Sequence, residues 1–221
     1  MIVSEILSKR DGTTGLRIEL QYLPCLAYFT LLLKYDRIHF DIEERYVKQT
    51  FRNRCSVLTA NKVDTLTVPV KKYEAATPTK DIKIDYSQEW MRRHLGCLKS
   101  AYGKSPFYEF YAPYFLDIYA KKLAYLVDLN YELLTICLRL VGVTKEIQYN
   151  LSGSGNTSSD EFNAISLINN NKGDITSTHY EPIPYYQTFG NDFVSNLSII
   201  DLLFNMGPEA KSVLLKSGKF Q

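Results

Sequence analysis

The stretch KQTFRNRC holds the side chains best suited to bind an anion. It contains Lys48, Arg52 and Arg54, with the carboxamides of Gln49 and Asn53 among them. A guanidinium can form two parallel hydrogen bonds to a phosphate or carboxylate, and an ammonium adds a compact positive charge. These five side chains are therefore predicted to hold the anionic group of a phosphorylated small molecule.

A second interpretation of this stretch needs no ligand. If residues 45–55 form a helix, apolar side chains recur at every fourth position on one side, and the cations and amides lie on the other. The apolar side would hold Val47, Phe51 and Cys55. Charged faces of surface helices normally point into water, so the polar side could be simply solvated. Arg54 would lie near the apolar side and need a buried carboxylate, for which Asp41 and Asp201 are candidates.

Among the three histidines, His94 has the setting best suited to proton transfer, because it follows Trp90 by one turn of a predicted helix. Histidine titrates near neutral pH and serves as a general acid or base. A single helical histidine more often forms structural hydrogen bonds, so both roles stay open. His39 and His179 lie far from it in the sequence, and this dispersal predicts no metal site.

The composition predicts a local anion site in a protein that is not generally basic. The chain of 221 residues has 26 Lys and Arg against 24 Asp and Glu, a formal charge of +2. This balance argues against nucleic acid as a partner. No apolar run approaches the roughly 20 residues of a membrane span. The N-terminus lacks the apolar core of a secretory signal, and the four cysteines form no C-x-x-C pair. We therefore expect a cytoplasmic protein without membrane insertion.

One domain is expected over residues 16–217, after a mobile tail at residues 1–15 that ends in the turn-forming letters DGTTG. Residues 151–178 are rich in Ser, Asn and Gly and offer little apolar surface to bury. They are predicted to form a polar surface excursion or lid. The sequence indicates neither a cofactor nor an oligomeric state.

The elements that position these residues predict an α/β fold with a small mixed sheet. Residues 16–22 and 37–42 are predicted to be adjacent parallel strands joined by a helix over residues 25–35, because such a connection has few other compact solutions. Their carboxyl ends would mark the edge where α/β proteins place ligands. A hairpin around Asn61 and Lys62 and a short strand IKIDY follow.

The middle and C-terminus are predicted to be helical. Asp85 and Gln88 have the spacing of a capping box before a helix that ends at Gly103. Pro113 is expected to break or restart the next helix. The later helices would be capped by Asp128 and Ser198.

Several blocks of the sequence resemble the WbqC-like protein family over most of the range from Leu16 to Glu209. They are YLPCLAYF, KQTFRNRC, LTVPV, EWMRRHLGCLKSAYGKSPFYEFY, YYQTF and NLSIIDLLFNMGPE. The R-N-R-C block and the closing S-I-I-D-L-L-F-N-x-G-P-E block are the most specific. The sequence departs from the family pattern at residues 20–21 and 25–27, where members often carry Gln-Pro and Trp-x-Gly.

The resemblance implies a context more than a mechanism, since the family is associated with bacterial surface-polysaccharide gene clusters. It favours the anion clamp over the solvated helix. It also adds substrate-binding candidates from the matching blocks, namely Tyr28, Tyr102, Gln187, Asp201 and Asn205. The tyrosines could stack on a sugar or base, or be core rings. Asp201 and Asn205 lie four residues apart on a predicted helix and could face the site together.

Two classes of function agree with these observations. The first is a transferase acting on a nucleotide sugar or another phosphorylated small molecule, with Lys48 and Arg52 holding the anion and His94 moving a proton. The second is a non-catalytic binding or scaffold protein of the same pathway. An enzyme should gather these three residues and Gln187 around one pocket, whereas a scaffold would disperse them and leave a flat apolar patch.

Overall fold

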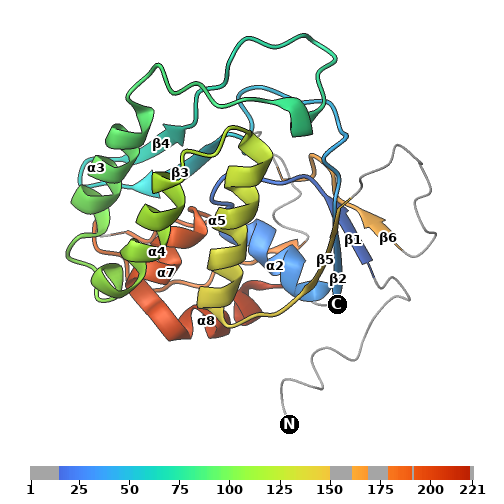
Figure 1. The fold of residues 1–221 in the computed structure, drawn as a ribbon. Coiled ribbons are helices and arrows are strands. Elements are labelled where there is room, and N and C mark those ends of the chain that lie inside the picture. Colours follow the sequence, from blue (N-terminus) through green and yellow to red (C-terminus); the bar gives the residue numbers. More distant parts are fainter. Residues whose placement is uncertain (1–14, 150–160, 169–178, 191, 220–221) are drawn as a thin grey trace.

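The computed structural model describes residues 15–149, 161–168, 179–190 and 192–219. A four-stranded parallel sheet with the strand order β5-β2-β1-β6 lies at one side of the molecule (Figure 1). The strands are β1 (Gly15–Ile18), β2 (Arg37–Phe40), β5 (Glu146–Tyr149) and β6 (Glu161–Asn163). Leu16 lies opposite Ile38 in the parallel register of β1 and β2. The predicted α/β class and the parallel start are therefore confirmed.

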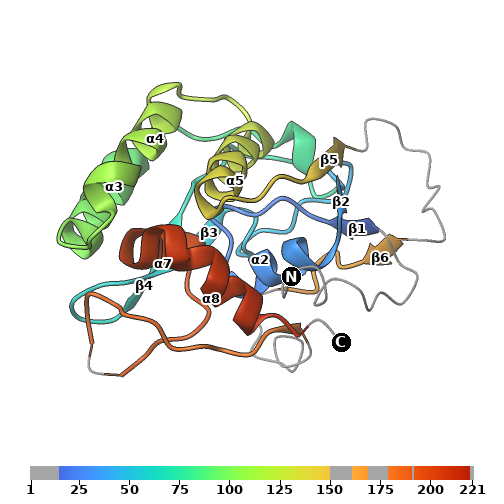
Figure 2. The same ribbon diagram turned by 90° about the horizontal axis from the view of Figure 1, so that it is seen from below.

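Helix α2 (Leu26–Lys34) joins β1 to β2, and each of its residues before Lys34 is buried. A helix that is apolar on all sides must be covered on all sides. Figure 2 shows α2, α5, α7 and α8 on one side of the parallel sheet. Ile18, Leu32 and Phe40 are fully buried in the core, which spans the sheet and these helices.

The predicted hairpin is confirmed as β3 (Arg54–Leu58) paired antiparallel with β4 (Val63–Thr67). Its turn is closed by the backbone N–H of Thr59, which donates to the carbonyl of Lys62 at 3.0 Å. The predicted strand IKIDY forms only isolated bridges, between Val70 and Ile84 and between Lys83 and Tyr125. This part of the chain pairs with two different segments and therefore does not extend a sheet.

The remaining elements are helical. They are η1 (Thr79–Asp81), α3 (Trp90–Tyr102), α4 (Tyr108–Ala120), α5 (Leu126–Val141), α7 (Ile199–Met206), η2 (Gly207–Glu209) and α8 (Ala210–Ser217). Helices α3 and α7 lie beside the hairpin (Figure 1). Helix α7 ends at Gly207, which has φ +52°.

Two predictions about helix boundaries are wrong. Pro113 lies inside α4. Its exposed position lets water hydrogen-bond the carbonyl that lost its partner. Asp128 does not precede α5 but lies in its first turn, where its charge complements the helix dipole.

Two predicted caps are also not formed by the expected side chains. Asp85 accepts the N–H of Ser87 at 2.9 Å in a turn before α3, which begins after Glu89 without a side-chain cap. Ser198 occupies the N-cap position of α7, but its hydroxyl donates to the carbonyl of Leu23 at 2.8 Å. Ser198 thus ties α7 to the loop after β1.

The prediction of a polar excursion is wrong for residues 161–168. Glu161–Asn163 form β6, which pairs with β1, and Ala164 and Ile168 are buried in the core. A strand of only three residues is too short to show the alternation of apolar and polar side chains by which strands are predicted. The rest of the predicted excursion, and the tail up to residue 14, lie outside the described residues.

Candidate anion-binding site

The stretch KQTFRNRC is not helical, so the prediction of an amphipathic helix is wrong. Residues 48–53 form turns, with Gln49 at φ +63°, and β3 begins at Arg54. The carbonyl of Phe51 accepts the backbone N–H of Tyr22 at 2.8 Å. This contact with the loop after β1 holds the backbone in a shape that a helix would not allow.

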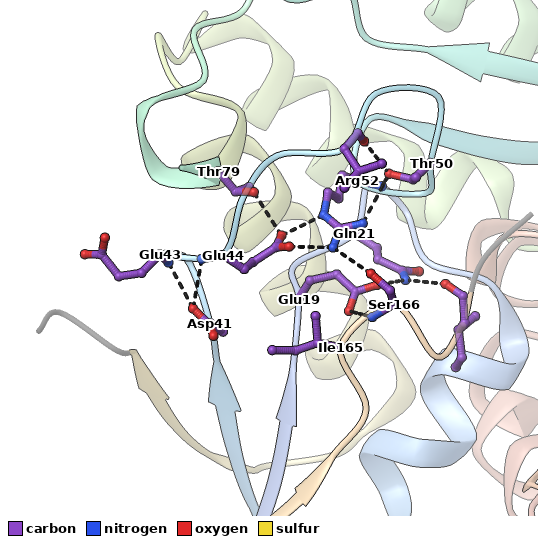
Figure 3. A network of polar contacts seen from close by, with 12 residues as sticks. Glu19, Gln21, Asp41, Glu43, Glu44, Thr50, Arg52, Thr79, Ile165 and Ser166 are labelled. Atoms are coloured by element: carbon purple, nitrogen blue, oxygen red, sulfur yellow. Dashed lines mark hydrogen bonds and ion pairs between the residues drawn. The ribbon is translucent and has the colours of Figure 1, made fainter. Parts of the chain in front are cut away.

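Arg52 is bound by the protein itself. Its Nε and Nη2 donate to the two carboxylate oxygens of Glu44, each at 2.6 Å, in a bidentate ion pair (Figure 3). The arginine side chain is 2% exposed, and it also donates to the hydroxyls of Thr50 and Ser166. Burial is the largest influence and lowers the pKa of Arg52. The hydrogen bonds that Arg52 donates to Glu44 and the negative charges of Glu19 and Glu44 together outweigh burial and raise this pKa. Arg52 therefore forms a structural ion pair in this conformation.

A second buried carboxylate, Glu19, lies directly after β1. Its two oxygens accept hydrogen bonds at 2.8 Å, one from Nε2 of Gln21 and one from the backbone N–H of Ser166 (Figure 3). Burial raises the pKa of Glu19, while the positive charge of Arg52 acts in the opposite direction. Because Ser166 follows β6, this contact joins the ends of two neighbouring strands.

A third carboxylate, Asp41, follows β2. One oxygen accepts the backbone N–H groups of Glu43 and Glu44, each at 3.0 Å, and the other pairs with Arg17. In the sheet, β2 and β6 lie on opposite sides of β1, so the connections that follow β1 and β5 lead to opposite sides of β1. The carboxyl ends of β1, β2 and β6 meet at this topological switch point. Ligands of open α/β sheets bind at such a point. Here the point itself is filled by side chains.

A cavity of about 660 Å³ lies beside this network and is the candidate anion site; we call it the cationic hollow. It is lined by Arg45, Tyr46, Val47, Lys48, Lys72, Tyr73 and Ala75. The first four belong to the loop after β2, and the others follow β4. None of the lining residues is acidic. The side chains of Arg45, Lys48 and Lys72 form no ion pair or hydrogen bond with any residue that the structure describes.

Tyr46 lines the cationic hollow and also lies close to Arg52 of the buried network. Its ring meets that of Tyr73 edge to face, with centroids 5.1 Å apart, and its side chain is almost fully buried. The hydroxyl has no hydrogen-bond partner among the described residues. Burial raises the pKa of Tyr46, and the charges of Arg52 and Arg54 partly oppose that rise. The phenol is therefore neutral, and its ring is rigidly placed.

His94 lies in a different cavity, of about 360 Å³, between β4 and α3. Its Nε2 donates to the carbonyl of Thr67 at 3.1 Å, which leaves Nδ1 to accept from the hydroxyl of Tyr22 at 2.8 Å. Tyr22 in turn hydrogen-bonds to Tyr119. Burial lowers the pKa of His94 to about 4. The imidazole is thus neutral with both nitrogens engaged, as expected of a structural hydrogen bonder.

The other residues predicted near Arg52 have different surroundings. Asn53 is buried and donates to the carbonyl of Val68 at 2.9 Å. The Tyr28 hydroxyl donates to the backbone carbonyl of Glu19 at 2.8 Å. Arg54 lies on β3, with a buried Nε that has no partner among the described residues. Gln49 is exposed in the turn.

The C-terminal candidates form a separate network on α7. Asp201 accepts hydrogen bonds from the Tyr185 hydroxyl at 2.7 Å and from Nε2 of Gln187 at 3.1 Å. Asn205 donates to the backbone carbonyl of Asp201, so these two do lie together. Burial raises the pKa of Asp201. Tyr102 is a core ring packed on Phe204. Arg54 is thus partnered by neither Asp41 nor Asp201, the two candidates.

The expected single pocket is not formed. Lys48 lines the cationic hollow, His94 lines the cavity at α3, and Gln187 belongs to the α7 network. Sequence reasoning missed most of the residues that line the hollow. The run VKKYE, immediately after the hairpin, was the available signal for Lys72 and Tyr73.

Three further observations concern the described residues. They contain no cluster of three or more His, Cys, Asp or Glu side chains able to hold a metal ion. None of the helices found in the described ranges has the length and apolar character to cross a membrane. All four cysteines are free thiols.

Comparison with known proteins gives a family and one distant relative. The model of the WbqC-like protein family matches residues 21–172 and 159–213. The chain is 25% identical to the "Uncharacterized protein Rv1507c" of Mycobacterium tuberculosis (strain ATCC 25618 / H37Rv), over 89% of this chain and 95% of that protein. No solved structure matches the chain.

Proposed function

Because the chain belongs to the WbqC-like protein family, we propose that it serves bacterial surface-polysaccharide biosynthesis in the cytoplasm by binding a phosphorylated small molecule in the cationic hollow. One observation carries this proposal. Three cations without described partners, Arg45, Lys48 and Lys72, line a single cavity that has no acidic residue in its wall. Such an arrangement disfavours the empty state and favours an anion.

The size and place of the cationic hollow support the same proposal. Its volume of about 660 Å³ falls within the range of roughly 300–1,000 Å³ that is usual for small-molecule sites. Arg45 and Lys48 lie in the loop that leaves the carboxyl end of β2, the edge at which open α/β sheets bind ligands. A charge-assisted hydrogen bond contributes about 1.5–3 kcal/mol. Micromolar affinity corresponds to about 8 kcal/mol, so three such bonds reach it when each contributes near the top of that range.

Ligand binding is better supported than catalysis by the predicted residues. His94, the expected proton-transfer group, lies in another cavity with both ring nitrogens engaged. A transferase acting on a nucleotide sugar is the second candidate, and the position of the hollow at the carboxyl edge of the sheet favours it. Such an enzyme would need a proton acceptor near the hollow. Glu44, next to Arg45 in the chain, does not meet this need in the present conformation, because both of its carboxylate oxygens accept hydrogen bonds from Arg52.

The alternative of a scaffold protein is supported by a different observation. On helix α4, Phe110 and Tyr114 lie four residues apart on one face and are 70% and 39% exposed. Exposed apolar side chains that lie near one another often mark protein–protein contacts. A binding protein with both features could present a bound ligand to a partner.

Binding can be measured by isothermal titration calorimetry with pyrophosphate as the probe. The variant Lys48→Ala/Lys72→Ala should weaken binding at least about tenfold, because two charge-assisted contacts are lost. Lys62→Ala is the matched control, since this lysine is exposed on the β3–β4 turn. If the wild type binds none of pyrophosphate, nucleotides and sugar phosphates, the proposal is wrong.

A further inference from the structure

Building on the proposed function, we infer that the cationic hollow binds a nucleoside diphosphate group, with the diphosphate on the three cations and the base stacked on Tyr73. The juxtaposition of unpaired charge and a supported aromatic ring in one cavity carries this inference. Neither feature alone would distinguish a nucleotide from other anions.

The number of cations favours two phosphates. Arg45, Lys48 and Lys72 bring a formal charge of +3 to a wall without acidic residues. A phosphate monoester carries about −1.5 to −2 at neutral pH, so a single phosphate leaves part of this charge unmatched. A diphosphate also spans more of the rim, because the cations come from two separate segments of the chain.

The aromatic side of the hollow favours a planar group. Tyr73 is partly exposed, and its ring is held edge to face, at 89°, by the buried ring of Tyr46. An aromatic ring that is already fixed loses little freedom when a base stacks on it. Val47, which is 45% exposed, adds apolar surface to the same cavity. Tyr73 also follows Lys72 directly, which brings a phosphate-binding and a ring-binding group together.

Two other cavities show why this combination matters. The cavity between α4 and α5 also contains tyrosines and cations. There Lys121 pairs with Glu132, and the guanidinium of Arg139 lies over the ring of Tyr114. The cavity beside His94 includes Asp64 together with Arg93 in its wall. Of these three cavities, only the cationic hollow places cations that have no partner among the described residues beside a supported ring.

The test compares UDP, ADP, UMP, pyrophosphate and uridine by isothermal titration calorimetry on the full chain. UDP and ADP should bind at least about tenfold more tightly than UMP, pyrophosphate and uridine. Tyr73→Ala should weaken UDP binding by about 5- to 150-fold, the range for loss of one stacked base, and leave pyrophosphate binding unchanged. Tyr73→Phe keeps the ring and should bind UDP like the wild type.

The outcomes separate this inference from the proposed function. If pyrophosphate binds as tightly as UDP, or Tyr73→Ala binds UDP normally, the stacking inference is wrong while anion binding stands. If uridine binds as tightly as UDP, the three cations do not contribute to binding, and the inferred diphosphate contact is wrong. If no anion in an extended panel that includes sugar phosphates binds, the proposed function itself fails. The comparison of ligands on the wild type decides these points even if Tyr73→Ala does not fold.

Discussion

Replacing Arg52 should damage the fold far more than the affinity for anions. The guanidinium is 2% exposed and forms a bidentate ion pair with Glu44, whose side chain is 10% exposed. In Arg52→Met, the buried carboxylate would keep only the hydroxyl of Thr79, at 2.9 Å, among its described side-chain partners. Leaving one member of a buried ion pair without its partner costs about 3–5 kcal/mol. That is a large part of the roughly 5–15 kcal/mol by which a domain is stable.

Equilibrium unfolding in urea measures this effect. With a slope of about 1–3 kcal/mol per molar urea, the midpoint of Arg52→Met should fall by at least about 1 M. The double variant Arg52→Met/Glu44→Gln removes the stranded charge and should recover part of the loss. A loss below about 1 kcal/mol, together with a loss of pyrophosphate binding, would falsify the structural role and restore Arg52 as a ligand clamp.

Two further predictions concern stability. The pKa of His94 is lowered to about 4 in the folded protein. Between about pH 6.5 and pH 4 the unfolded chain therefore binds a proton at this histidine that the folded chain does not. His94 should for this reason make the free energy of unfolding fall by about 3 kcal/mol from pH 7 to pH 4. Glu19 and Asp201 have raised pKa values, so their effect on the pH dependence of stability is opposite. The difference in the free energy of unfolding between the wild type and His94→Gln, measured by urea unfolding at several pH values, isolates the effect of the histidine. If that difference does not change with pH, His94 is not held neutral in the folded protein. Gly207→Ala should destabilise by more than about 1 kcal/mol, because φ is +52° and the added Cβ would lie 2.5 Å from the Phe107 ring. A melting temperature within about 1 °C of the wild type would show that this turn is not constrained.

Local pattern was enough to predict the framework. The β1-α2-β2 unit, the hairpin around Asn61 and Lys62, and most helices follow from the spacing of apolar residues and from turn-forming residues. These signals lie within one element or between neighbours in the chain. The same local reasoning misplaced several caps. A side chain such as that of Ser198 can bond equally well to a distant carbonyl, and only packing decides between the two.

The sequence by itself determined which residues carry charge, and the tertiary structure decided which of those charges are available. Lys48 and Arg52 are close in sequence and alike in chemistry, yet one lines the cationic hollow and the other is buried against Glu44. The difference arises because β6 returns to the far side of β1 and places Ser166 over the end of the sheet. Likewise, Lys72 joins Lys48 only because the segment after the hairpin packs beside the loop after β2. Such contacts join residues far apart in the chain, and their free energy comes from burial that no local sequence pattern records.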